Sequence, residues 1–165
     1  MLKEETVHLL SLTAGMEKEK FVIRVKVKNP VDRTLYAYGS ARRIIYNNNT
    51  GKLTLYLHDH HLSEAEEEYI SPHLREPRFV PLEAESVSEL KIMLDPILNN
   101  IRSAAERGSG PLFEELRIAE ATDIHVEIAY QDTPFYYNPK IANAKQLKDW
   151  GKIISKANFK IPLTQ

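Results

Sequence analysis

The sequence predicts a mainly β fold, an antiparallel β-sandwich with a short C-terminal helix. At least six short segments alternate apolar and polar residues, and turn-forming residues separate them about every ten positions. No helical segments of about ten to fifteen residues alternate with these strands, so parallel βαβ units are not expected. A small barrel is the alternative architecture.

The composition is typical of one folded domain. The chain has 165 residues, and its 22 basic and 23 acidic residues leave a net charge of −1. Near-neutrality argues against a dedicated nucleic-acid binder, whose domain is usually strongly basic. The lack of cysteine excludes disulfides, thiolate metal sites and cysteine nucleophiles. We divide the chain into a β-sandwich over 1–139 and a basic, helical or extended C-terminal appendage over 140–165, packed on the same domain.

The start of the chain does not have the pattern of a secretory signal. Residues 1–6 carry both charge signs, and His8 and Ser11 interrupt the short apolar stretch that follows. No apolar run of about 20 residues occurs in the sequence. We therefore expect a cytoplasmic protein with no membrane partner.

Residues 21–28 form the clearest predicted strand. Apolar residues occupy every second position and basic residues occupy most of the others, as expected for one buried and one solvated face. Pro30 follows the strand closely and ends it, because proline cannot donate to a sheet. Residues 7–12 are the predicted partner strand.

The next two predicted strands form a hairpin. Residues 35–46 are expected to be one strand with a bulge or kink at Gly39. A polar turn containing Gly51 follows, and residues 53–58 then alternate strictly. A strand, a glycine-bearing turn and a second strand indicate an antiparallel hairpin.

The middle of the chain is acidic. Residues 64–89 hold eight acidic and two basic residues, and three prolines exclude a long helix there. Residues 63–69 fit either one helical turn or a solvated loop. Residues 90–94 alternate again and predict a strand, whereas 97–107 fit either a short helix or a connection.

The last part of the chain contains one strong strand and one helix candidate. Residues 124–130 alternate apolar and polar side chains. Residues 142–150 are the best helix candidate, with Gly151 placed to end the helix. From position 140 onward the chain has six lysines and one aspartate.

A histidine cluster is the most suggestive chemical feature. On a strand, His58 and His60 point to the same side, and Glu64 follows nearby, so these residues are candidate ligands for one transition metal ion. The spacing His58-x-His60-x-x-x-Glu64 resembles half of the cupin metal motif. That resemblance implies a small jelly-roll-like barrel and a further histidine ligand from a later strand. If these residues do not bind a metal, the histidines lie at the end of a strand and face water, and we expect no cofactor.

Two further patterns suggest acid–base chemistry and nucleic-acid binding. His125 and Glu127 share one face of the strand at 124–130 and form a possible acid–base pair. Residues 18–43 are rich in lysine and arginine, which could contact phosphates. A nucleic-acid surface would also need tyrosines on neighbouring strands beside these residues, so that bases can stack on their rings. The acidic segment can neutralise this basic region within the molecule, so we do not expect nucleic acid as the partner.

The segment from 78 to 90 resembles a recurring pattern of bacterial immunoglobulin-like sandwiches. In this segment, as in those sandwiches, two apolar residues and a Pro-Leu pair come before a short polar turn, and a strand with alternating apolar and polar residues follows. Residues 25–30, a strand closed by Asn-Pro, are similar in style. The resemblance implies an immunoglobulin-like fold and an accessory, adhesive or partner-binding role. We therefore expect a non-catalytic protein-interaction module, with a metal-dependent cupin-like enzyme or metal-binding protein as the alternative.

Two segments are candidates for the contact with another protein or a second copy of the chain. Three consecutive aromatic residues, Phe135, Tyr136 and Tyr137, lie between two prolines and either plug one end of the sandwich or anchor a partner. In the basic tail, Lys152 and Lys156 are placed to attract an acidic surface.

Overall fold

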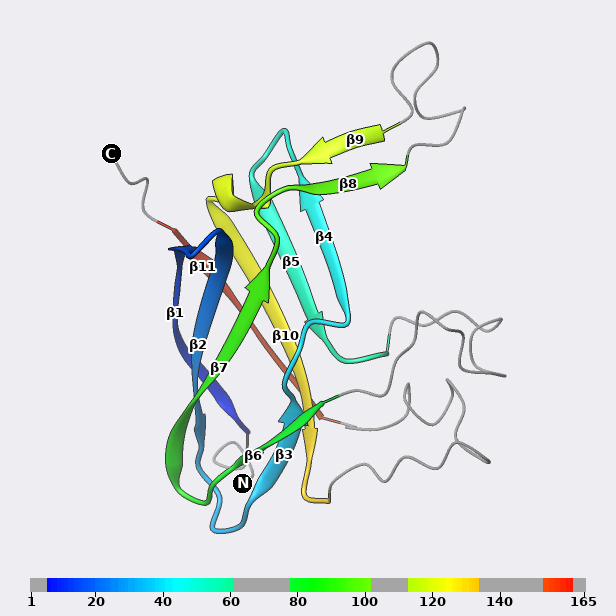
Figure 1. Cartoon of the computed structure of the whole chain (residues 1–165). Coiled ribbons are helices and arrows are strands. Elements are labelled where there is room, and N and C mark those ends of the chain that lie inside the picture. Colours follow the sequence, from blue (N-terminus) through cyan, green and yellow to red (C-terminus); the bar gives the residue numbers. More distant parts are fainter. Residues whose placement is uncertain (1–5, 61–77, 102–112, 134–152, 162–165) are drawn as a thin grey trace.

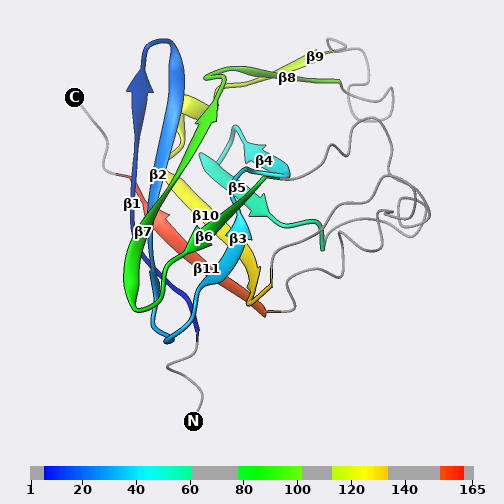
Figure 2. The same cartoon turned by 60° about the horizontal axis from the view of Figure 1, so that its bottom comes forward.

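The computed structural model describes residues 6–60, 78–101, 113–133 and 153–161 (Figure 1). These ranges contain eleven strands and one short 3₁₀ helix. Two larger sheets face each other as the layers of a sandwich-like fold that is not a closed barrel (Figure 2). The predicted mainly β, sandwich-like fold is confirmed, and the barrel alternative is wrong. No helix in these ranges is both long and apolar enough to cross a membrane.

The smaller sheet has three antiparallel strands in the order β1-β2-β7. Their bounds are β1 (His8–Glu17), β2 (Lys20–Asn29) and β7 (Ser86–Leu94). The predicted strands at 7–12, 21–28 and 90–94 all belong to this sheet. Lys18 and Glu19 form the β1–β2 turn with φ of 48° and 71°, and positive φ at both turn residues matches the right-handed twist of a hairpin.

The larger sheet is built around β10 (Asp123–Gln131), which confirms the predicted strand at 124–130. One edge of β10 pairs antiparallel with β11 (Ile153–Lys160). The other edge pairs first with β5 (Lys52–Leu57), in parallel, and then with β3 (Leu35–Tyr38), antiparallel. The strands β4 (Arg43–Asn47) and β6 (Phe79–Leu82) complete the sheet beside β5 and β3. The parallel pair β5–β10 makes this sheet mixed, whereas antiparallel pairing was expected throughout.

The predicted single strand at 35–46 is two strands, β3 and β4. The break falls at Gly39, whose backbone N–H donates to the carbonyl of Arg78 at 2.8 Å. A Cβ on Gly39 would lie 2.9 Å from Cγ1 of Val80, so a side chain there would force Val80 of β6 to shift. The kink expected at Gly39 is therefore present, and it lets β3 and β4 pair with different neighbours. The predicted hairpin is confirmed as β4–β5.

A two-stranded ribbon projects from the sandwich beyond the end of β7 (Figures 1 and 2). It consists of β8 (Leu98–Ile101) and β9 (Phe113–Leu116), paired antiparallel. The short 3₁₀ helix, η2 (Ile118–Glu120), follows β9. The helical alternative for 97–107 is wrong at 98–101, because these residues exchange their hydrogen bonds with another strand.

The C-terminal segment takes part in the larger sheet. The helix predicted over 142–150 lies outside the described residues, as do the turn at 63–69 and most of 97–107. The described part of the segment from 140 to 165 is β11, a strand and not a helix. β11 alternates less clearly than β10, which explains why its sequence did not predict a strand.

The core lies between the two sheets and is made by their alternating apolar faces. Ile23, Val25 and Val27 of β2 and Leu53, Leu55 and Leu57 of β5 are fully buried there, with Ile124, Val126 and Ile128 of β10. At one side of the sandwich the sheets are tied together by polar contacts. The hydroxyl of Tyr130 accepts the backbone N–H of Val7 at 3.0 Å, and Ser155 Oγ donates to the Val7 carbonyl.

Candidate functional site

A cluster of two histidines and a glutamate lies on the outer face of the larger sheet. Because side chains alternate along a strand, the leucines of β5 face the core while Thr54, Tyr56 and His58 face outward. On β10, His125 and Glu127 face outward for the same reason. The parallel register sets Glu127 opposite Tyr56, so His58, two residues further along, lies within reach of Glu127.

Glu127 joins the two histidines. Its Oε1 lies 3.1 Å from Nε2 of His58, and its Oε2 lies 2.8 Å from Nε2 of His125. The backbone N–H of His60 donates to Nδ1 of His58 at 3.1 Å, which leaves the proton of a neutral His58 ring on Nε2, facing the carboxylate. Nδ1 of His125 lies 2.7 Å from Oδ1 of Asn158 on β11. The cluster therefore links three strands of the sheet.

Burial and hydrogen bonding set the charges of the cluster. Burial lowers the pKa of His58 below its ordinary value, although the hydrogen bond with Glu127 opposes this shift. Burial alone would raise the pKa of Glu127, but the hydrogen bonds from His125 and His58 outweigh it and hold that pKa below its usual range. At neutral pH, Glu127 is thus ionised and His58 is neutral.

A buried ion pair lies next to the cluster. Asp59 is fully buried, and its carboxylate accepts the Nε–H of Arg42 at 3.0 and 3.1 Å and the hydroxyl of Tyr38 at 3.2 Å. Burial and the charge of Asp59 raise the pKa of Tyr38 far above its ordinary value, so its hydroxyl stays protonated. Asp59 follows β5, Tyr38 belongs to β3, and Arg42 lies between β3 and β4. The contacts therefore hold these three segments together.

The structure only partly brings together the candidate metal ligands. His58 is 3% exposed, so the expectation that it faces water is wrong. The rings of His58 and His60 are in contact, with centroids 5.0 Å apart, but both nitrogens of His58 already have partners. Glu64 lies outside the described residues. Within the described residues, no group of three histidine, aspartate or glutamate side chains is arranged to hold a metal ion.

The pairing of His125 with Glu127 is formed as the sequence indicated, but the participation of His58 was missed. The two histidine patterns were considered as separate sites because 69 positions separate His58 from Glu127. Only the parallel pairing of β5 with β10 makes them neighbours. Polar residues on the outward positions of both strands are the signal in the sequence that a shared site was possible.

Of the residues predicted to contact a partner, only Lys156 is among those described. It is exposed on β11, opposite Glu127 in the register. Phe135, Tyr136, Tyr137 and Lys152 lie outside the described residues.

The basic residues and the tyrosines of the possible nucleic-acid surface are on different layers. Arg24, Lys26 and Lys28 belong to β2 of the smaller sheet. Tyr36, Tyr38 and Tyr56 belong to β3 and β5 of the larger sheet. The arrangement needed for base stacking beside these basic residues is therefore not formed by these strands.

No family model matches the chain, and no similar protein was found among curated sequences or solved structures. The chemistry of the cluster is consequently judged from its geometry. The ring nitrogens of His58 and both oxygens of Glu127 are already occupied by contacts within the sheet. These contacts stabilise the sheet.

Proposed function

We propose that the chain is a non-catalytic protein-interaction module and that its contact surface is the smaller sheet. One observation carries the proposal: exposed large apolar side chains concentrate on that sheet. Of the six such side chains in the described ranges, four lie on its two outer strands, β1 and β7. They are Leu10 (52% exposed), Met16 (53%), Val87 (53%) and Met93 (56%). Val87 and Met93 lie on the outer face, whereas Met16 pairs with Phe21 on the core-facing side.

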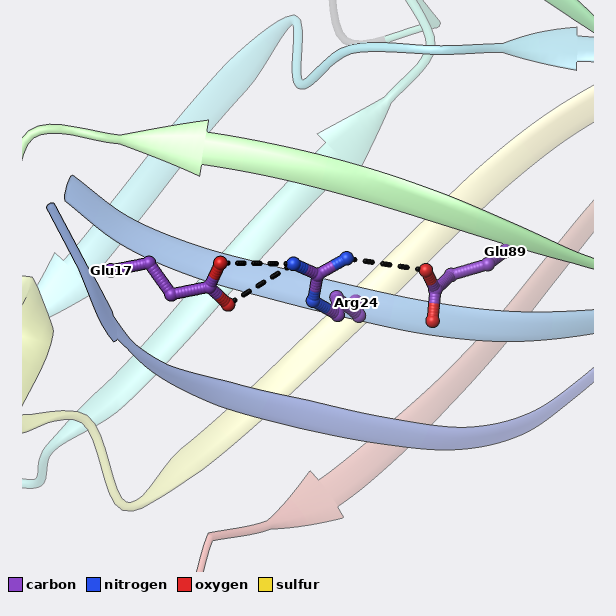
Figure 3. A network of polar contacts seen from close by, with 3 residues as sticks. All are labelled: Glu17, Arg24 and Glu89. Atoms are coloured by element: carbon purple, nitrogen blue, oxygen red, sulfur yellow. Dashed lines mark hydrogen bonds and ion pairs between the residues drawn. The ribbon is translucent and has the colours of Figure 1, made fainter.

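The outer face of this sheet is also basic. Its acidic side chains Glu17 and Glu89 both contact Arg24, at 2.9 and 3.3 Å (Figure 3). Lys26, Lys28 and Lys91 have no ion-pair partner among the described residues. Uncompensated positive charge beside exposed methionine and valine favours a partner whose surface is acidic around an apolar centre.

The larger sheet supports a non-catalytic role. Two of its carboxylates, those of Glu127 and Asp59, are engaged by neighbouring side chains of the same molecule. A general base needs an open position within hydrogen-bond reach of its substrate. At this cluster both oxygens of Glu127 already accept hydrogen bonds within the sheet, which favours a binding role for the smaller sheet.

Photo-crosslinking tests this proposal. A photoreactive phenylalanine is placed at position 93, or at position 45 as a matched control, because Ile45 is 42% exposed on β4 of the larger sheet. Each full-length protein is irradiated in an extract of the cells that make it. We expect one defined protein linked at position 93, competed by excess unlabelled protein, and no such product at position 45. Absence of a product at 93, or the same product at both positions, contradicts the proposal.

A further inference from the structure

The free edges of the two sheets differ in how well they are protected against pairing with another strand. β6 has only four residues and contains Pro81, and β4 has only five. β1 is interrupted by a bulge between Leu9 and Ser11. β11 lies against the start of β1, where Ser155 bonds to Val7. Short strands, proline, bulges and covering segments are the usual means of blocking an edge.

Among the described residues, β7 has no proline and no bulge, and no strand pairs with its second edge. The strand is nine residues long and keeps an unbroken register with β2 from Ser86 to Leu94. β2 is its only strand partner among the described residues, and no backbone group in these residues pairs with its other edge. Such an edge can accept an additional strand.

A groove runs along the second half of this edge. Residues 91–94 of β7 form one wall, and residues 39–41 with Arg78 form the opposite wall. The groove has a volume of about 330 Å³, which is within the range of binding pockets. Ile92 and Leu94 provide apolar surface on the inner side of β7, and Met93 is 56% exposed on the outer side.

The groove is positively charged. Lys91 and Arg78 are exposed, one on each wall, and neither has an ion-pair partner among the described residues. The register sets Lys91 beside Arg24, whose charge is balanced by Glu17 and Glu89. Glu89, the nearest acidic neighbour on β7, forms an ion pair with Arg24 (Figure 3). Among the described residues, no ion pair joins Glu89 to Lys91. A segment lying in this groove therefore gains most if it is acidic.

We propose that the free edge of β7 binds an extended acidic segment of a partner protein, which adds to the smaller sheet as a fourth strand. Backbone hydrogen bonds to residues 91–94 hold the segment. Its outward side chains are acidic and lie next to Lys91, and its inward side chains are apolar and lie next to Ile92 and Leu94, because successive residues of a strand face opposite sides. This inference rests on the proposed function and specifies the mode of binding.

The test uses a capped octapeptide of alternating glutamate and valine and the ¹⁵N-labelled full-length protein. We expect saturable binding, with exchange slowed about tenfold or more at those amide hydrogens of 91–94 that point to the free edge, and with exchange at the β4 edge unchanged. Two further peptides carry N-methyl groups at alternate residues, one at the odd positions and one at the even positions. N-methylation removes the backbone hydrogen-bond donors at those positions. The peptide that is methylated at the positions paired with β7 should bind about tenfold more weakly than the parent peptide. A peptide with lysine in place of glutamate should also bind more weakly.

Protein variants provide a second measurement. Lys91→Glu should weaken binding of the acidic peptide about tenfold, whereas Lys52→Glu, an equivalent change at an exposed lysine of β5, should not. Circular dichroism confirms that both variants are folded. Three results would reject strand addition at β7. These are equal affinities of the parent and both N-methylated peptides, slowed amide exchange at a different strand, and a Kd of the parent peptide above about 1 mM.

The two proposals fail in distinguishable ways. If a protein is crosslinked at position 93 but the peptide results are negative, the interaction module stands and the β7 edge is not its binding element. If the peptide pairs with β7 but no protein is crosslinked at position 93, the edge is competent while the proposed contact surface of the native partner is wrong.

Discussion

Replacing Glu127 by glutamine should destabilise the protein, because its carboxylate holds His58 and His125 on neighbouring positions of the sheet. The side chain of Glu127 is only 19% exposed, so water replaces these hydrogen bonds poorly. Glutamine has nearly the same shape but only one acceptor oxygen, and its amide N–H groups face a ring N–H. The change therefore removes the charge and at least one hydrogen bond with little change in packing.

The expected size of the effect follows from the contacts. Hydrogen bonds to charged groups contribute about 1.5–3 kcal/mol each to stability. Glu127 makes two, at 3.1 and 2.8 Å, and the glutamine oxygen can keep one of them. We expect Glu127→Gln to lower the free energy of unfolding at pH 7.5 by about 2 kcal/mol.

The effect should depend on pH with a definite sign. The pKa of Glu127 is lower in the folded than in the unfolded chain, so its stabilisation is present above the unfolded value of about 4.3 and is lost as pH falls through the folded value. The two proteins should therefore converge in strongly acidic solution. The pKa of His58 is also lowered by folding, so both proteins lose stability as pH falls below about 6.5.

Urea unfolding followed by circular dichroism from pH 8 down to about pH 2 measures these differences. Glu115→Gln is the matched control, because Glu115 is 48% exposed and contacts Arg117 only at 3.4 Å. The control should change stability by less than about 0.5 kcal/mol. If Glu127→Gln is as stable as the native protein at pH 7.5, or if its deficit does not shrink in acid, the account of this cluster is wrong.

Three further outcomes are expected. Gly51→Ala should lower the free energy of unfolding by more than about 1 kcal/mol, because Gly51 has φ of 74° and a Cβ would lie 2.7 Å from Oγ1 of Thr122. Gly15→Ala should lower it less, because no atom lies within 4 Å of a Cβ there. Equal free energies of unfolding for the two variants would contradict this reasoning. Asn29→Ala should lower the free energy of unfolding in urea by about 2–3 kcal/mol, because the buried side-chain amide bonds to three backbone carbonyls and one backbone N–H. A loss below about 0.5 kcal/mol would be inconsistent with those hydrogen bonds. Protein purified without an affinity tag should contain less than about a tenth of an equivalent of transition metal by elemental analysis, because both nitrogens of His58 are engaged; a full equivalent would mean that the cluster rearranges.

Much of the fold was predictable because alternation records which side of a strand is buried. The apolar positions of 21–28, 53–58 and 124–130 are the ones that line the core. Where alternation is weak, prediction failed. The single strand expected at 35–46 is divided at Gly39, because the backbone must bend close to Arg78, a residue distant in sequence.

The candidate site was only half predictable. His125 and Glu127 stand two residues apart on one strand, so their contact follows from strand geometry alone. The contact of Glu127 with His58 depends on a parallel pairing across 69 positions, which local patterns do not encode. The burial of His58 also escaped prediction, because an outward position on an isolated strand reads as exposed.

By itself, the sequence determined that this chain forms strands, which of their side chains face inward, and that charge is separated along its length. These properties follow from the two-residue period of a strand and from the cost of burying polar groups. Only the tertiary structure decided which strands are neighbours, and hence that His58 meets Glu127 and that no described strand pairs with the second edge of β7. Strand pairing is a contact between distant segments, so it depends on the packing of the whole chain.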